Sequence, residues 1–91
     1  MNVLFHQSAL ADYQRWAAED KKIFDKINTL LNEIMHDPFR GTGKPEPLKH
    51  DMAGYWSRRI NHRNLFREHR LVYTVSGELI TVISCKFHYK K

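Results

Sequence analysis

A glutamate between two prolines and a histidine near the end of the chain are the residues of this sequence best suited to chemistry. Glu46 lies in Pro45-Glu46-Pro47, where each proline ring fixes its own φ and biases the preceding residue toward an extended shape. A carboxylate, the imidazole of His88 and nearby guanidinium groups would provide the proton acceptor, the proton donor and the cations for metal-independent phosphodiester cleavage. On composition alone, a solvated turn glutamate and a surface histidine explain the same residues.

The cations of the chain are concentrated in its second half. Residues 1–39 hold four Lys/Arg and six Asp/Glu, whereas residues 40–70 hold eight and three, within a formal net charge of +5. Planar guanidinium groups suit phosphate recognition, and five of them lie close together in the sequence: Arg58, Arg59, Arg63, Arg67 and Arg70. This pattern predicts a polyanionic partner, and a basic surface that serves only solubility is the alternative.

Length and composition limit the other classes. The 91 residues predict one domain over residues 1–91 with one modest core. There is no apolar run near the ~20 residues of a membrane span and no signal-peptide pattern, so we expect a cytoplasmic protein without a membrane partner. Cys85 is the only cysteine and predicts a buried hydrophobe. A Gly-rich phosphate loop and metal-binding motifs are absent, so no cofactor or metal is expected.

Periodicity predicts an α+β fold with the order β-α-α-β-β-β(-β). A short strand over residues 3–5 precedes a first helix capped near Ser8, and Asp20 caps a second helix that ends at Asp37-Pro38. The expected core stripes are Leu10, Tyr13, Trp16 and Ala17 in the first helix, and Ile23, Ile27, Leu30, Leu31 and Ile34 in the second.

A loop over residues 41–49 then carries Glu46 and leads to strands over residues 55–60, 70–75 and 79–87, with a tight turn at Ser76-Gly77. The two-helix hairpin should pack on this antiparallel sheet. Because side chains alternate along a strand, Arg58 and Arg59 face opposite sides, so only one of them faces a site.

Four sequence blocks resemble a known family. Residues 44–50 (Lys-Pro-Glu-Pro-Leu-Lys-His), 56–60 (Trp-Ser-Arg-Arg-Ile), 68–73 (Glu-His-Arg-Leu-Val-Tyr) and the His88-Tyr89 pair are similar to those of YoeB toxins in the RelE/ParE superfamily. The resemblance covers nearly the whole chain. It implies the RelE-like microbial ribonuclease fold and a type II toxin that cleaves mRNA in the ribosomal A site. It also implies a YefM-like antitoxin with an acidic, partly apolar segment, and a possible homodimer.

The resemblance also implies roles for individual residues. Glu46 would be the base, Arg70 would steady the phosphate, and His88 and Tyr89 would supply the acid and a ring against the RNA. The expected RNA-binding cations are Lys44, Lys49, Arg58, Arg59, Arg63, Arg67 and Lys90.

The sequence departs from the family pattern in two places. The segment of residues 61–67 makes its hairpin about five residues longer than a tight turn, which is either a surface insertion or a change of register that moves Arg70. Lys90 and Lys91 follow the His-Tyr pair that normally ends the chain. Two alternatives remain: a non-catalytic binding module or ParE-like toxin with another target, and a DNA-binding domain, for which no helix-turn-helix is recognisable.

Overall fold

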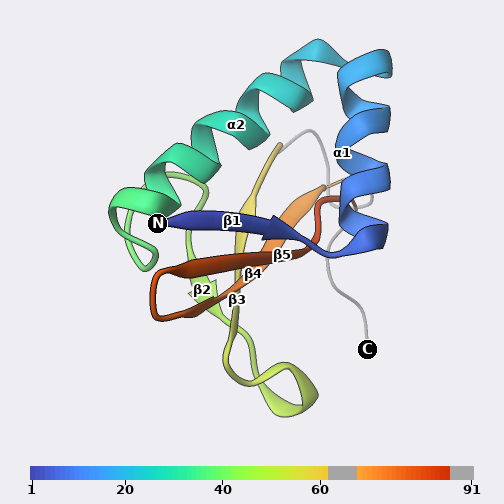
Figure 1. Ribbon diagram of the computed structural model, residues 1–91. Helices are drawn as coiled ribbons and strands as arrows, with labels where there is room; N and C mark the ends of the chain where they lie inside the picture. The colour runs from blue at the N-terminus through green and yellow to red at the C-terminus, as the bar shows by residue number, and fades with distance from the viewer. Residues whose placement is uncertain (62–67, 87–91) are drawn as a thin grey trace.

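The part of the chain that the structure describes folds into two α-helices and five strands, whose arrangement is shown in Figure 1. The computed structural model describes residues 1–61 and 68–86. The elements in chain order are β1 (Asn2–Phe5), α1 (Gln7–Glu19), α2 (Lys21–His36), β2 (Glu46–Pro47), a 3-10 turn η1 (His50–Met52), β3 (Tyr55–Arg59), β4 (Arg70–Ser76) and β5 (Leu79–Ser84). The predicted order of helices and strands is confirmed, with β2 as an additional two-residue strand inside the expected loop.

The five strands form one sheet in the order β1-β5-β4-β3-β2. Strands β2 to β5 pair antiparallel, as expected, whereas β1 pairs parallel with β5. The sheet is therefore mixed. The direction of β1 was not foreseen because a four-residue apolar run does not reveal which neighbour it will pair with.

The helix boundaries follow local capping in one case and not in the other. Asp20 caps α2, since its Oδ1 accepts a hydrogen bond from the backbone N–H of Ile23 at 3.2 Å. The expected cap at Ser8 is wrong: α1 begins at Gln7 with His6 as the N-cap residue, and no side chain caps it. At the other end, α2 stops at His36, immediately before Asp37-Pro38 as predicted.

The core lies between the helical hairpin and one face of the sheet (Figure 1). Its fully or nearly fully buried members are Ala9, Ile27, Leu30, Leu31 and Ile34 from the helices, and Ile60, Leu71, Tyr73, Ile80, Val82 and Cys85 from the sheet and its ends. The predicted stripe of α2 is confirmed. In α1, Tyr13 and Trp16 pack against the core, but Leu10 is 40% exposed and Ala17 is exposed, so α1 uses Ala9 in their place.

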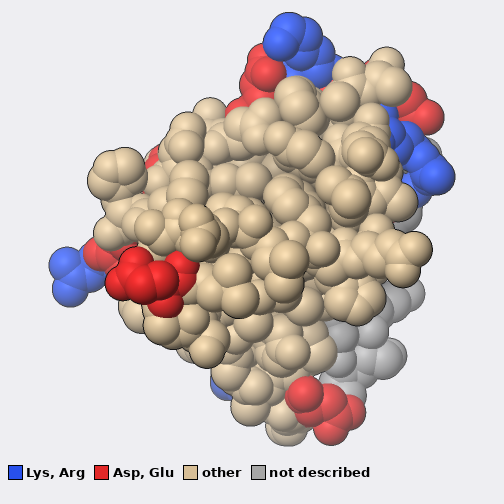
Figure 2. Space-filling view, in the orientation of Figure 1, with Lys and Arg blue, Asp and Glu red and all other residues tan. Residues whose placement is uncertain are grey.

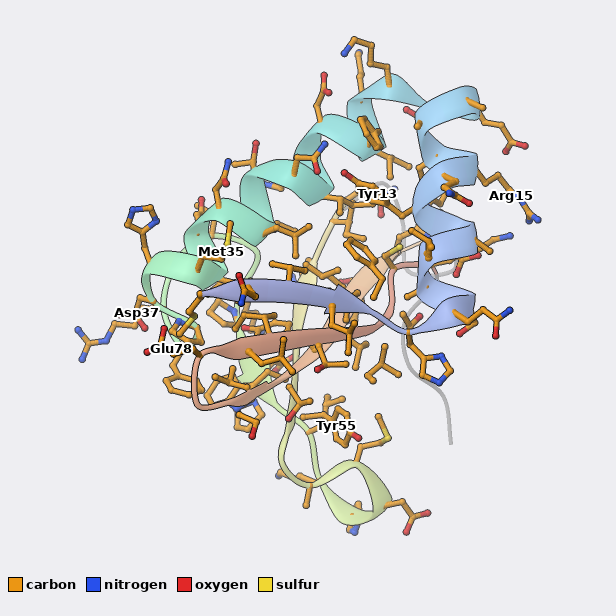
Figure 3. The ribbon with its side chains drawn as sticks, in the orientation of Figure 1. Tyr13, Arg15, Met35, Asp37, Tyr55 and Glu78 are labelled. Carbon is orange, nitrogen blue, oxygen red and sulfur yellow. The ribbon has the colours of Figure 1, made fainter. Side chains whose placement is uncertain are left out.

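Side-chain hydrogen bonds join α1 to the rest of the core, including one from Cys85 Sγ to the carbonyl of Ala9 at 3.5 Å. The hydroxyl of Tyr13, which points toward α2 in Figure 3, donates to Asn28 Oδ1 at 2.7 Å. The indole Nε1 of Trp16 donates to the backbone carbonyl of Cys85 at 2.9 Å. These bonds satisfy polar atoms that the packing removes from water and fix the hairpin over the sheet.

The molecular face seen in Figure 2 carries few charges, which lie at its periphery. That face holds β1 and the two helices, in the orientation of Figure 1. Among the residues that the structure describes, no helix is long and apolar enough to span a membrane.

Candidate functional site

Sheet register brings Glu46 and Arg70 together, although 24 positions separate them in the sequence. Glu46 on β2 lies opposite Ser57 of β3, and Arg59 of β3 lies opposite Arg70 of β4. Residues directly opposite or diagonal on one face are within reach of long side chains. Arg70 Nη1 accordingly donates to Glu46 Oε1 at 3.0 Å. The pair lies on the sheet face that the helices do not cover, which is called the open face below.

Two further groups hold the Arg70 guanidinium. Its Nη1 also donates to Ser57 Oγ at 3.1 Å, and its Nη2 lies 3.3 Å from Glu68 Oε2. Ser57 is fully buried, and the Arg70 side chain is only 17% exposed. The guanidinium therefore has a defined orientation before any ligand binds, which limits the reorganisation that binding requires.

Glu68 also contacts the second arginine of the site. Arg59 Nε lies 3.0 Å from Glu68 Oε2, although the two atoms are not aligned as a hydrogen bond. Two guanidinium groups and two carboxylates thus lie together, with the Glu46 side chain the most exposed of the four at 41%. An incoming phosphate would have to compete with Glu68 for both arginines.

Lys44 and Lys49 lie close to Glu46 in the sequence, but within residues 1–61 and 68–86 they make no hydrogen bond or ion pair with this cluster. Lys44 and Lys49 are both exposed, and Lys44 has a positive φ of 52°. Their ammonium groups can add to the local positive potential without taking a fixed position.

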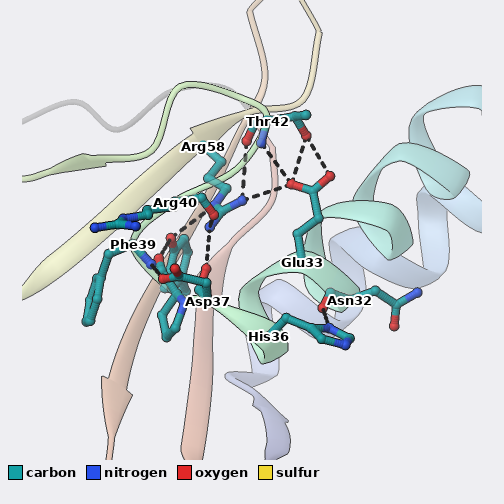
Figure 4. A network of polar contacts seen from close by, with 10 residues as sticks. Asn32, Glu33, His36, Asp37, Phe39, Arg40, Thr42 and Arg58 are labelled. Atoms are coloured by element: carbon teal, nitrogen blue, oxygen red, sulfur yellow. Dashed lines mark hydrogen bonds and ion pairs between the residues drawn. The ribbon is translucent and has the colours of Figure 1, made fainter.

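The prediction that Arg58 binds RNA is wrong for the folded chain. Arg58 is fully buried on the helix side of β3. Its guanidinium donates to Glu33, to Tyr73 and to three backbone carbonyls (Figure 4). The physical reason is strand alternation: with Arg59 on the open face, Arg58 must face the interior. The expectation that only one of these two arginines faces the site is thereby confirmed.

Five of the predicted site residues lie outside the described residues, and their roles stay predictions. They are Arg63, Arg67, His88, Tyr89 and Lys90. Within residues 1–61 and 68–86, no three His, Cys, Asp or Glu side chains are grouped so that they could hold a metal ion.

Sequence reasoning assigned no role to Ser57 or Glu68. Both could have been found from the period of two along a strand, because Ser57 shares a face with Arg59 and Glu68 shares one with Arg70. What the sequence did not reveal is the register of β2 on β3, which determines that Ser57 lies beneath the Glu46–Arg70 pair.

Comparisons with known proteins identify the family of the chain. The family profile described as "YoeB-like toxin of bacterial type II toxin-antitoxin system" matches residues 5–89. Toxin YoeB from Synechocystis sp. is 47% identical over 91 residues, which cover 100% of both chains.

Several solved structures are also similar to this chain. A YoeB/ParE toxin from Agrobacterium tumefaciens has a TM-score of 0.89 at 47% identity, covering 98% of this chain and 100% of that one. The YoeB chains of a heterotetrameric YoeB-YefM complex and of a YoeB dimer, both from Staphylococcus aureus, give TM-scores of 0.85 and 0.86 at 47% identity, covering 98% of each chain. The chain therefore belongs to the YoeB-like toxins of bacterial type II toxin-antitoxin systems.

Proposed function

We propose that this toxin is a ribosome-dependent endoribonuclease that cleaves mRNA in the A site without a metal ion and so inhibits translation. The observation that supports this most directly is the 3.0 Å contact between Glu46 and Arg70 on the open face of the sheet. A carboxylate beside a guanidinium is suited to a substrate that presents both an acidic hydroxyl proton and a phosphate.

In this mechanism Glu46 removes the proton from the 2′-hydroxyl of the RNA, which then attacks the adjacent phosphate. Within residues 1–61 and 68–86, the hydrogen bond to the Glu46 carboxylate is made through Oε1. In the proposed mechanism the second oxygen, Oε2, accepts the hydroxyl proton. The ion pair with Arg70 holds the carboxylate in one orientation between turnovers.

Arg70 and Arg59 stabilise the phosphorane that forms after this attack. Each guanidinium now faces Glu68, and a phosphate oxygen carries the same kind of charge as that carboxylate. Binding of RNA would therefore exchange one anion for another at groups that are already in place. His88 would protonate the leaving 5′-oxygen and Tyr89 would stack on a base, roles that rest on the family resemblance.

The proposed partners of the toxin are based on the assemblies of similar YoeB toxins. YoeB of Staphylococcus aureus forms a heterotetrameric complex with YefM and also a dimer. We therefore propose that this toxin is neutralised by a YefM-like antitoxin whose acidic, partly apolar segment orders on the cationic surface, and that the free toxin forms a homodimer. The affinity for the antitoxin should fall as the salt concentration rises, because exposed charges are screened.

The decisive test is Glu46→Gln in a translation reaction that contains ribosomes and a defined mRNA. Removal of a general base should lower the single-turnover cleavage rate by about 10²–10⁴-fold, while circular dichroism stays that of the wild type. Glu78→Gln is the matched control, since Glu78 lies in the turn between β4 and β5 (Figure 3), is 87% exposed and contacts the N-terminal ammonium group at 3.8 Å.

The same assay distinguishes the alternative function. If wild-type toxin leaves the mRNA intact on programmed ribosomes but still binds its antitoxin, the chain is a non-catalytic binding module or a ParE-like toxin with another target. If Glu46→Gln instead cleaves at the wild-type rate, the toxin is a nuclease but Glu46 is not its general base.

A further inference from the structure

Arg58 is the most fully engaged side chain in the described part of the molecule. Its Nε donates to the Tyr73 hydroxyl at 3.1 Å, and its Nη1 donates to Glu33 Oε1 at 3.1 Å. The other three bonds go to backbone carbonyls: Thr42 at 3.3 Å, Asp37 at 3.0 Å and Arg40 at 2.7 Å. A guanidinium has five N–H donors, so its capacity is used in full (Figure 4).

The three carbonyls belong to a segment that forms neither a helix nor a strand. Residues 37–42 follow the end of α2 and form turns and bends rather than a helix or strand. Inside the segment, the backbone bond from Arg40 to Asp37 is long, at 3.5 Å. Arg58 therefore replaces the regular backbone pairing that this stretch lacks.

Neighbouring groups add further contacts around Arg58, and the whole set of hydrogen bonds that holds residues 37–42 is called the clamp below. The Tyr73 hydroxyl donates to the carbonyl of Pro38 at 2.6 Å, and both the N–H and the hydroxyl of Thr42 donate to Glu33 Oε1, at 2.8 and 2.9 Å. Gly41 passes so close that a Cβ there would lie 2.6 Å from Arg58 Nη1, and its φ is +131°. Only glycine fits this backbone position without moving the guanidinium.

The clamped segment leads directly to the site. Immediately after it, the carbonyl of Gly43 accepts a hydrogen bond from the N–H of Arg59 at 2.6 Å, and three residues later Glu46 pairs with Ser57. Strand β2 has only two residues and lies at the edge of the sheet, so β3 is its sole pairing partner in the sheet. So short a strand has little pairing of its own to fix its position.

We propose that Arg58 is a positioning residue for the reaction: it holds residues 37–42 so that β2 forms and Glu46 stays beside Arg70. The inference rests on the proposed nuclease function for its kinetic consequences and on the hydrogen bonds above for its structural ones. The ion pair joins the buried Arg58 to Glu33, whose side chain is 30% exposed, and such a pair contributes little net stability, which favours a role in geometry over one in stability.

The first test compares Arg58→Lys with Arg15→Lys, a matched control on the exposed face of α1 where the side chain points into solvent (Figure 3). Lysine keeps the charge but has three donors on one atom, so it cannot reach Tyr73, Glu33 and the three carbonyls together. In single-turnover cleavage on programmed ribosomes, Arg58→Lys should lower the maximal rate by about tenfold to a hundredfold with a half-saturating concentration close to that of the wild type. Arg15→Lys should change neither.

A double-mutant cycle separates positioning from direct contact. If Arg58 acts through Glu46, then Arg58→Lys should lower the residual rate of Glu46→Gln by less than about twofold. Equal losses in both backgrounds, or a weaker affinity with an unchanged maximal rate, would overturn the proposal, because an independent RNA contact gives those results.

Hydrogen exchange tests the clamp without reference to activity. The amides of Arg59 and Leu48, which donate to the carbonyls of Gly43 and Tyr55, should exchange faster in Arg58→Lys, whereas those of α2 and β5 should not. Unchanged exchange at Leu48 and Arg59 would overturn the proposal even if cleavage falls. If the wild-type toxin cleaves no RNA, the nuclease proposal fails, and exchange alone decides the clamp.

A second variant approaches the same contact from the loop, in case Arg58→Lys does not fold. Gly41→Ala should reproduce the faster exchange and the lower maximal rate, because its Cβ collides with the guanidinium. Gly54→Ala is the control for backbone strain alone, since Gly54 also has a positive φ of +96° but its Cβ would meet no atom within 4 Å. Equal effects of the two alanines would contradict the role of the Arg58 contact.

Discussion

The hydroxyl of Tyr73 should be a major source of stability, and Tyr73→Phe tests this directly. Tyr73 is fully buried on β4, where its hydroxyl accepts from Arg58 Nε at 3.1 Å and donates to the carbonyl of Pro38 at 2.6 Å. Burial raises the pKa of Tyr73, although the hydrogen bond and charge of Arg58 oppose this shift, so the hydroxyl stays protonated and able to donate.

The expected cost follows from the two groups that phenylalanine leaves without a partner. An unsatisfied buried polar group costs about 1–3 kcal/mol, and a charged donor such as Arg58 Nε lies at the upper end of that range. Tyr73→Phe should therefore lower the free energy of unfolding by about 2–5 kcal/mol. For a domain of this size each kcal/mol corresponds to roughly 4–8 °C in Tm, so a fall of about 8–40 °C is expected.

Urea and thermal unfolding followed by circular dichroism provide the measurement. Tyr55→Phe is the matched control, because Tyr55 is half-buried on β3 and its hydroxyl makes no hydrogen bond to the described residues. It should alter stability by less than about 0.5 kcal/mol. A loss below about 1 kcal/mol for Tyr73→Phe, or equal losses for the two tyrosines, would refute the reasoning, since the buried network would then relax at almost no cost.

Two further predictions concern ionisation. Burial raises the pKa of Glu33, but hydrogen bonds from Thr42 and the charge of Arg58 outweigh that effect and hold the pKa below its ordinary value of 4.5. Its contribution to stability should be present above pH 4.5 and be lost as the pH falls through the lowered pKa. In urea unfolding, Glu33→Gln should therefore be less stable than wild type at pH 7, and the difference should shrink as the pH falls below 4.5. Burial also raises the pKa of Cys85 to about 12, so a thiol reagent at pH 8 should label it only as fast as the protein unfolds; rapid labelling of native toxin would show that Cys85 is accessible.

Local sequence signals predicted the elements where one interaction dominates. The stripe of α2, its Asp20 cap and the turn after Ser76 each depend on residues near in sequence, and each was predicted correctly. The start of α1 was missed because Ser8 competes with other residues whose backbone can begin the helix equally well, and tertiary packing decides between them.

The site was predictable in its residue types and less so in its contacts. Restraint by two prolines identified Glu46, but its proximity to Arg70 depends on the register of three strands, which a single sequence does not reveal. The longer segment before Arg70 also left its face uncertain. In the structure Arg70 lies opposite Arg59 and contacts Glu46, so the two residues share one face of the sheet.

Strand β3 explains why adjacent arginines do different work in this chain. Its side chains alternate between the open face, where Ser57 and Arg59 contact the ion-pair cluster, and the interior, where Arg58 holds the segment that precedes Glu46. A one-residue shift of β3 would exchange the two sets, placing Arg58 at the site and leaving residues 37–42 without their donor. Such a shift would remove the positioning of Glu46 and the Ser57 contact to Arg70 together. The register of β3 is therefore a single structural variable on which both carboxylate and guanidinium placement depend.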